Sequence, residues 1–390
     1  MTPQDLFLAR LDALVIQCNE VQKAIKSPGI NRNLYQRAAT DLLGGIGNEQ
    51  RRIENLRSIT RNGKVAAGSW ETLQANGKKC ATLFGECLGF LQASRARGHD
   101  VDADLCEIAD ALLDELSELT RIKWGRFTVL ATEEFFLDLA QIIRLRFPFS
   151  GIWDLPVAAH EFGHFVAGRL NAARPDGSRY LPFQDEKKNF REQHKDLGEE
   201  WMFYLEEYFA DVFATYVLGP AYACTCFLLR FDPASAHLEK DKRHPSYAKR
   251  AYAVVQTLRR MNGEQDSKGD YQKPTDVLAG LWAQMLLSAG QTAALSREEE
   301  AQVGGIVSNF YGMLKDGAPG ARFNRWRNVK LRGCPSVETG ELPDGSQVAD
   351  LNISEVLNSA WLCRMRPDSD SGRLSTNVVQ LCRRLSGGSP

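Results

Sequence analysis

Apolar residues recur at intervals of three and four along most of the chain, a spacing that is typical of amphipathic helices. This spacing occurs throughout the first third of the chain, returns near the middle after a short interruption, and continues to the last residues of the sequence. The helices predicted in this way are 6–25, 33–59, 105–119, 155–170, 197–218, 221–231, 246–261, 275–288, 296–314, 354–365 and 375–385.

Two short segments near the middle of the chain interrupt the helical spacing. Residues 126–132 and 141–149 are rich in β-branched and aromatic side chains, which favours strands, and Pro148 marks the end of the second. The polar stretch 171–196, which holds a single apolar cluster, is interpreted as a loop. The expected fold class is therefore mainly α with a small β-sheet.

Composition and charge narrow the class of protein. The 390 residues include 48 Lys and Arg against 49 Asp and Glu, so the formal net charge is −1 and gives no bulk attraction to nucleic acid or to an acidic membrane. With 43% apolar residues the chain is expected to bury a core, which excludes a disordered or collagen-like class. The pattern divides it into an N-terminal helical region, a core with the strands, and a C-terminal helical region: 1–123, 124–265 and 266–390.

The sequence also indicates a compartment. There is no run of 18 apolar residues, so no membrane-spanning helix is expected, and the first 27 residues lack the uninterrupted apolar core of a secretory signal. The nine cysteines are odd in number and include no Cys-x-x-Cys. We therefore expect a cytoplasmic protein with reduced, mostly buried thiols, and we assign no metal or redox role to Cys224 and Cys226.

Two of only six histidines stand four residues apart, in His160-Glu161-Phe162-Gly163-His164. Positions i and i+4 of a helix share one face, so the two imidazoles can bind one ion with Glu161 beside it. This is the His-Glu-x-x-His arrangement of zinc hydrolases, in which the Glu takes a proton from zinc-bound water. The alternative is a buried helix whose histidines hydrogen-bond to backbone groups.

The third ligand is sought on the apolar helix 197–218. From Trp201 onward this helix is apolar nearly all round, yet it carries Glu206, Glu207 and Asp211. Buried carboxylates are rare unless they are paired or bind a metal. Glu207 and Asp211 share a face, so we assign Glu207 as the third zinc ligand and Asp211 as the acceptor of an N–H from a ligand histidine. The alternative is that these acids form salt bridges to neighbours such as Arg169. Glu206 is expected either to form such a salt bridge or to bind near the cleft.

The two motifs together resemble those of a known family. His160-Glu161-x-x-His164 followed by Glu207-Tyr208-Phe209-Ala210-Asp211 resembles the gluzincin metallopeptidases, and the second helix also resembles the intracellular ImmA/IrrE-like branch. The likeness covers about residues 126–262, with 42 residues between His164 and Glu207. It implies a zincin-like core that holds one Zn²⁺ per chain and hydrolyses peptide bonds.

The resemblance suggests two further features of the site. Several gluzincins carry a His-Pro-x-x-x-x-Arg segment after the glutamate helix, which implies that His244, ahead of Pro245 and Arg250, could hydrogen-bond the oxyanion of the tetrahedral intermediate. The alternative for His244 is a surface position in a charged loop. An edge strand borders the cleft in such peptidases, and the segment 141–147 is the candidate here. Three tyrosines could also donate to the oxyanion, and the sequence does not choose among Tyr204, Tyr208 and Tyr247.

The function expected from the sequence is that of a cytoplasmic zinc endopeptidase with few protein substrates and a regulatory or defence role. Glu161 would be the general base, and the helical flanks would bind a substrate protein, gate the cleft or sense a signal. One alternative is a partner-binding protein that keeps a zinc-stabilised fold without catalysis. A second is a nucleic-acid-associated regulator that uses 322–332, a segment with five basic residues and two aromatics, although a loop against acidic neighbours is the preferred interpretation of that segment.

Overall fold

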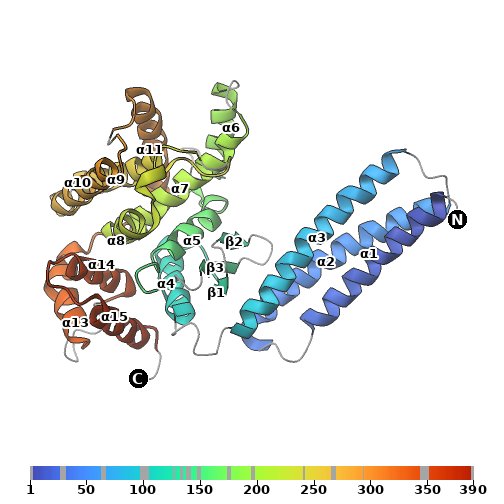
Figure 1. Cartoon of the computed structure of the whole chain (residues 1–390), viewed down its shortest axis with the longest axis horizontal. Coiled ribbons are helices and arrows are strands. Elements are labelled where there is room, and N and C mark those ends of the chain that lie inside the picture. Colours follow the sequence, from blue (N-terminus) through green and yellow to red (C-terminus); the bar gives the residue numbers. More distant parts are fainter. Residues whose placement is uncertain are drawn as a thin grey trace. The chain divides into compact units, whose positions relative to one another are not determined.

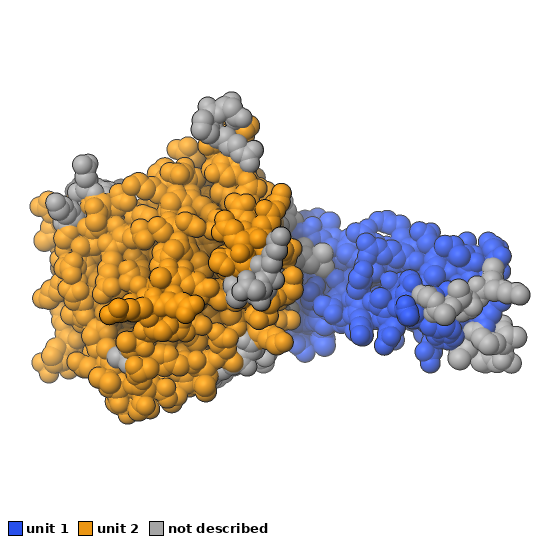
Figure 2. Space-filling view, turned by 90° about the horizontal axis from the view of Figure 1, so that it is seen from above, with its two compact units in different colours: residues 1–106, 126–147 blue, residues 107–125, 148–390 orange. Residues whose placement is uncertain are grey.

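The computed structural model shows a mainly helical protein with two small β-sheets. The chain forms two compact units, coloured separately in Figure 2: residues 1–106 with 126–147, and residues 107–125 with 148–390. The residues described are 3–26, 32–62, 67–96, 105–125, 128–131, 135–137, 142–146, 151–173, 177–194, 198–239, 242–264, 269–292, 294–342 and 351–387.

The first unit is built on three long helices that lie side by side (Figure 1). They are α1 (Pro3–Ile25), α2 (Arg32–Arg61) and α3 (Ala67–Ala96). Their apolar stripes meet in one core, and the ring of Phe7 packs edge-on against Trp70 with 5.0 Å between centroids. The core also includes Val129 of the sheet. The predicted helices 6–25 and 33–59 are confirmed as α1 and α2, whereas α3 was not assigned from the sequence.

A three-stranded sheet completes the first unit. It consists of β1 (Thr128–Ala131), β2 (Phe135–Leu137) and β3 (Ile142–Arg146), in the order β1-β3-β2. The strand β3 pairs in parallel with β1 and antiparallel with β2, so it is the central strand. The prediction that 141–147 is an edge strand open to a peptide is therefore wrong, because both hydrogen-bonding sides of β3 are already used. Residues 141 and 147 themselves lie outside the described part of the chain.

The second unit is centred on helix α7 (Glu200–Leu218), of which almost every residue after Phe203 is buried. Helix α5 (Val157–Ala167) packs along it, and α9 (Tyr247–Gly263) and α11 (Arg297–Gly317) pack against it as well. The contact with α5 is close at Gly163, where an added Cβ would lie 2.9 Å from the Cα of Ala210. Only glycine allows this approach, and it brings the faces of α5 and α7 together.

The remaining elements of the second unit surround this centre. They are α4 (Leu105–Thr120, from Glu107), β4 (Ala172–Ala173), β5 (Arg179–Tyr180), α6 (Pro182–Gln193), α8 (Pro220–Thr225), the π-helical turn Cys226–Arg230, α10 (Gln272–Ser288), α12 (Trp326–Asn328), a second π-helical turn Val329–Gly333, α13 (Cys334–Thr339), α14 (Ile353–Arg364) and α15 (Ser371–Leu385), with 3-10 turns at Pro233–Ser235 and Pro319–Ala321. The helix α11 begins with the capping box of Ser296 and Glu299.

One expected loop contains a helix. Within 171–196, the helix α6 begins with Pro182 at its first turn and buries Phe183 and Phe190, seven residues apart on one face. Two apolar anchors are too few to give a clear periodic signal in a sequence that is otherwise polar. The predicted helices at 155–170, 197–218 and 246–261 are confirmed as α5, α7 and α9.

The break between α7 and α8 sets the course of the chain after the central helix. Gly219 adopts φ +58°, a conformation that favours glycine, and Pro220 starts α8. The side chain of Asn358 on α14 bridges the break: its Nδ2 donates to the Leu218 carbonyl, and its Oδ1 accepts from the Ala221 N–H, at 2.8 and 3.0 Å. The two backbone groups that the break leaves open are thus satisfied in the core.

The compact units do not coincide with the three regions expected from the sequence. The strands belong with the N-terminal helices, whereas the two helices with the histidines and acids share a unit with all of 266–390. None of the helices in the described ranges combines the length and the apolar character that crossing a bilayer requires.

Candidate metal centre

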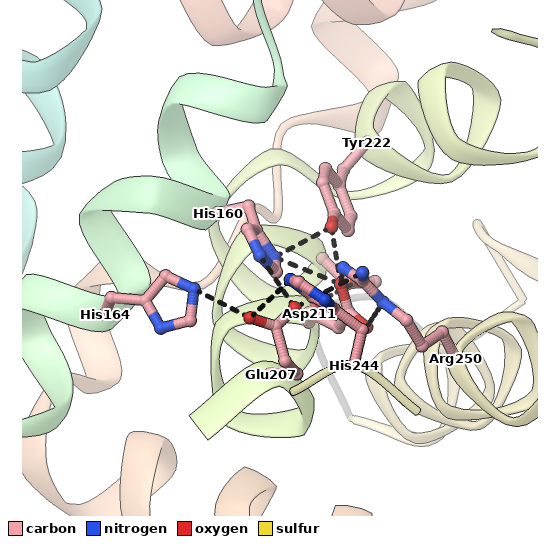
Figure 3. Close-up of polar contacts among 8 residues, drawn as sticks. His160, His164, Glu207, Asp211, Tyr222, His244 and Arg250 are labelled. Carbon is pink, nitrogen blue, oxygen red and sulfur yellow. Dashed lines mark hydrogen bonds and ion pairs between the residues drawn. The ribbon is translucent and has the colours of Figure 1, made fainter. Parts of the chain in front are cut away.

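Helix α5 presents the His-Glu-x-x-His motif from a buried position. Every residue of the helix except His164 is buried, and Phe162 and Phe165 fix it in place by packing edge-on against Trp124, with 5.5 and 5.0 Å between ring centroids. His160 and His164 point toward α7 (Figure 3). The helix period thus places the two imidazoles on one face, as the sequence predicts.

Glu207 of α7 lies opposite both imidazoles. Its Oε2 is 3.4 Å from His160 Nε2, and its Oε1 is 3.4 Å from His164 Nε2. One ligand atom from each of the three residues lies within 4.8 Å of the others, a grouping that could hold one metal ion. Oε2 of Glu207 is buried, and its nearest polar neighbours are Arg250 Nη1 at 3.2 Å and His160 Nε2 at 3.4 Å, so a cation between the imidazoles would be a further partner for it. Two imidazole nitrogens and one carboxylate are a donor set that suits zinc.

Asp211 lies one turn further along α7 and is fully buried. Its Oδ1 is 3.1 Å from His160 Nδ1, which is the contact that the sequence predicts for Asp211. The guanidinium of Arg250, on α9, donates to both carboxylate oxygens at 2.8 Å and lies 3.2 Å from Glu207 Oε2. Burial raises the pKa of Asp211, but the charge and hydrogen bonds of Arg250 lower it to about 2, so the carboxylate is ionised.

Tyr222 is a residue of the site that the sequence did not indicate. Its hydroxyl is 2.6 Å from Asp211 Oδ1 and 3.0 Å from His160 Nδ1. The break at Gly219 and Pro220 turns α8 so that this side chain comes back to the site. A tyrosine in an apolar segment is more often part of a core, and the Gly-Pro break was the one available signal.

The imidazole of His160 stands between the two acids. Burial lowers the pKa of His160, but hydrogen bonds with Asp211 and Glu207 raise it to about 10. A cation that binds Nε2 would therefore take the place of a proton, and its binding would depend on pH. Burial raises the pKa of Glu207, but Arg250 and the imidazoles lower it well below its ordinary value, so its carboxylate is ionised.

The two predicted catalytic residues differ in how exposed they are to solvent. Glu161 is 7% exposed and its carboxylate makes no hydrogen bond within the described part of the chain. His244 lies on the loop before α9, which begins at Tyr247 with Ser246 as its N-cap. Its side chain is 49% exposed, and Nε2 is 3.7 Å from Glu207 Oε1. The structure thus brings His244 to the open side of the cluster, and its part in catalysis stays a prediction.

Glu206 and two of the three tyrosines considered from the sequence have partners away from the cluster. Glu206 pairs with Lys187 of α6 at 2.6 Å, as expected, and Arg169 donates to the Phe165 carbonyl. The contacts of the tyrosines are as follows: Tyr204 donates to Glu239 at 3.1 Å, Tyr247 stacks on Phe231, and the hydroxyl of Tyr208 is buried with no hydrogen-bond partner among the described residues.

The basic segment 322–332 packs into the second unit. Arg325 pairs with the buried Glu355 at 2.8 Å, and Arg322 lies 3.5 Å from Glu264. Phe323 and Trp326 are buried, so their rings do not form a platform for stacking bases. The acidic neighbours are as expected, but the prediction of a strand or loop is wrong, because residues 326–332 lie in α12 and the π-helical turn that follows it.

The cysteines are free and buried, as expected, and those of the second unit include Cys224 and Cys226. Burial raises the pKa of both thiols, so neither is a thiolate poised for a metal. His194 packs against Phe190, and His237 contacts the Thr292 carbonyl, while His99 lies outside the described residues.

The whole chain was also compared with known proteins. No protein-family model, curated protein or solved structure matches it.

Proposed function

We propose that the chain is a zinc-dependent endopeptidase with a zincin-like site in its second unit, as the resemblance to gluzincins suggests. The observation that carries this proposal is the cluster of His160, His164 and Glu207 with the buried Glu161 on the same helix. Nine buried, free thiols support a reducing compartment such as the cytoplasm.

Within this proposal each side chain has one task. His160, His164 and Glu207 would hold the zinc ion, which supplies a Lewis acid to polarise the scissile carbonyl and to acidify a water molecule. The carboxylate of Glu161 accepts a proton from the attacking water and delivers it to the nitrogen of the departing amine. His244, on the open side, donates a hydrogen bond to the developing oxyanion.

The metal content of the purified protein tests the first part. Protein prepared without chelator should carry about one zinc per chain, as measured by atomic emission, and His160→Ala with His164→Ala should lose it. A wild-type chain that binds no divalent metal with useful affinity contradicts the proposal.

The second test separates a peptidase from a metal-stabilised binding protein. Glu161→Gln should keep the zinc and lose cleavage, by about a thousandfold or more, because the amide cannot accept the proton. The readout is a comparison of new protein N-termini in cells that express wild type or Glu161→Gln. If both give the same cleavage, another base is used; if neither cleaves while both bind zinc, the protein is a non-catalytic scaffold.

A further inference from the structure

We infer that the hydroxyl of Tyr222 is a positioning group for the metal centre, which accepts the Nδ1–H of His160 and so presents Nε2 of that ring to a cation. The inference rests on the proposed metal site and assigns a role to a residue outside the predicted ligands. It makes α8, and not only the two motif helices, part of the site.

The geometry confines the hydroxyl to a small set of partners. The Tyr222 side chain is 2% exposed, and its ring lies nearly parallel to the imidazole of His160, with 10° between planes and 6.1 Å between centroids (Figure 3). The hydroxyl oxygen is 3.0 Å from His160 Nδ1 and 2.6 Å from Asp211 Oδ1. Burial of this kind leaves little room for water to replace either contact.

The single proton of the hydroxyl decides the direction of these bonds. Asp211 is ionised because Arg250 donates to both of its oxygens, so the carboxylate can only accept. The Tyr222 O–H therefore donates to Asp211, over the shorter distance, and its oxygen is left as an acceptor. Both oxygens near His160 Nδ1 are then acceptors, and the stable arrangement has the proton on Nδ1.

The opposite arrangement is unfavourable in the same surroundings. If Tyr222 donated to His160 Nδ1, the lone pair of that nitrogen would face Asp211 Oδ1 at 3.1 Å, with no proton between two acceptors. Asp211 Oδ1 would lose the Tyr222 donor and keep only Arg250 Nη2, and two acceptors would be in contact in a buried site, which is unfavourable. Nε2 would then carry the proton of the neutral ring and could not bind a metal.

Tyr222 supplies something that Asp211 cannot supply alone. Oδ1 of Asp211 already receives two shorter hydrogen bonds, from Arg250 Nη2 at 2.8 Å and from the Tyr222 hydroxyl at 2.6 Å, so its contact with His160 Nδ1 at 3.1 Å is the longest of the three. The oxygen of Tyr222, whose proton goes to Asp211, has lone pairs to spare for the Nδ1–H of His160. Asp211 thus orients the Tyr222 hydroxyl, and the hydroxyl in turn orients the imidazole of His160.

The first experiment compares zinc affinity in Tyr222→Phe and wild type by competition with a chromophoric chelator, using the full chain. Loss of a group that orients a ligand histidine should weaken zinc binding about 10- to 100-fold. Tyr311→Phe is the matched control, because it removes a hydroxyl that bonds to Glu264 away from the site, and its zinc affinity should equal that of wild type. Equal affinities in all three proteins would overturn the inference.

The second experiment reads the imidazole itself and does not depend on the variant's stability. In the cobalt-loaded wild-type chain, the shifted ring N–H resonance of His160 should exchange with solvent more slowly than that of His164, whose side chain is 19% exposed. In Tyr222→Phe the His160 signal should move and exchange faster while that of His164 stays. An unchanged His160 signal with zinc still bound overturns the inference alone, whereas a wild-type chain that binds neither metal overturns it together with the proposed function.

Discussion

Arg250 is the one guanidinium that contacts both acids of the cluster within the described residues, and it is buried with them. Its partners Asp211 and Glu207 have side chains that are 0% and 11% exposed. Removing one member of a buried ion pair leaves an uncompensated charge in the core, which costs far more than the loss of a surface pair. The stability of the second unit should therefore depend on this residue apart from any catalytic role.

Arg250→Gln should lower the free energy of unfolding by about 3–5 kcal/mol, because two carboxylates would remain buried without their cation. Lys187→Gln is the matched control, since it breaks the more exposed pair with Glu206 and should cost at most about 1 kcal/mol. Urea unfolding at neutral pH measures both. Similar midpoints for the two variants would show that the buried pair has no special weight.

The residues of the cluster differ in how visible they are in the sequence. His160 and His164 are apparent from their spacing, and Glu207 and Asp211 from the conflict between a carboxylate and an apolar helix. Tyr222 offers no such conflict, because a tyrosine in an apolar segment needs no explanation. Its role follows only from its contact with His160, which is 62 residues away in the sequence. The periodicity of apolar residues cannot reveal such a contact.

At the scale of elements, the close approach of α5 and α7 depends on the glycine inside the motif. A Cβ at Gly163 would lie 2.9 Å from the Ala210 Cα and 3.2 Å from the Phe213 ring. The first neighbour is backbone and cannot turn aside, so the two helices would have to separate. The ligands sit on both of these helices, which means that the spacing also sets the size of the metal site.

Gly163→Ala should destabilise the protein by about 1–3 kcal/mol through overpacking, and should also weaken zinc binding. Gly305→Ala is the control: it lies on the exposed side of α11 with nothing within 4 Å of its added Cβ, so it should stabilise by up to about 1 kcal/mol through helix propensity. Thermal unfolding and chelator competition provide the two readouts. The prediction fails if both substitutions shift stability in the same direction.

The elements themselves were largely predictable where apolar spacing is regular. Most of the helices and both predicted strands appear near their expected positions, whereas α3 and β2 were not assigned and α6 was hidden in a polar stretch. The pairing of β3 on both sides could not be predicted from the sequence, for a different reason. Which strand is central depends on hydrogen bonds to β1 and β2, and the side chains of a short strand do not report them.

At the scale of the whole molecule, a carboxyl group joins the start of the second unit to its C-terminal part. Glu115 of α4 accepts hydrogen bonds from the Ile353 N–H and the Ser354 hydroxyl at the beginning of α14. Burial raises the pKa of Glu115 to about 7, even though these bonds and the neighbouring backbone oppose the shift. The unfolded chain has an ordinary glutamate at this position, with a pKa near 4.5.

The raised pKa predicts how stability changes with pH. The protonated carboxyl contributes its full stability below about pH 4.5, and this contribution is lost as the pH rises through 7. Glu115→Gln, which cannot ionise, should therefore lose less stability than wild type between pH 5 and pH 8, by about 1–3 kcal/mol. Urea titrations at several pH values test this, with the exposed Glu107→Gln on the same helix as control. Parallel curves for wild type and Glu115→Gln would contradict it.

The bridge made by Asn358 has a consequence for dissecting the protein. A fragment that ended near residue 265 would keep all the predicted ligands, yet it would lose the amide that closes the gap between α7 and α8. Tyr222 lies on the first turn of α8, directly after that gap. The motif region is therefore not a transplantable module: any minimal version of the site must carry α14 with it, either in the same chain or supplied as a separate peptide.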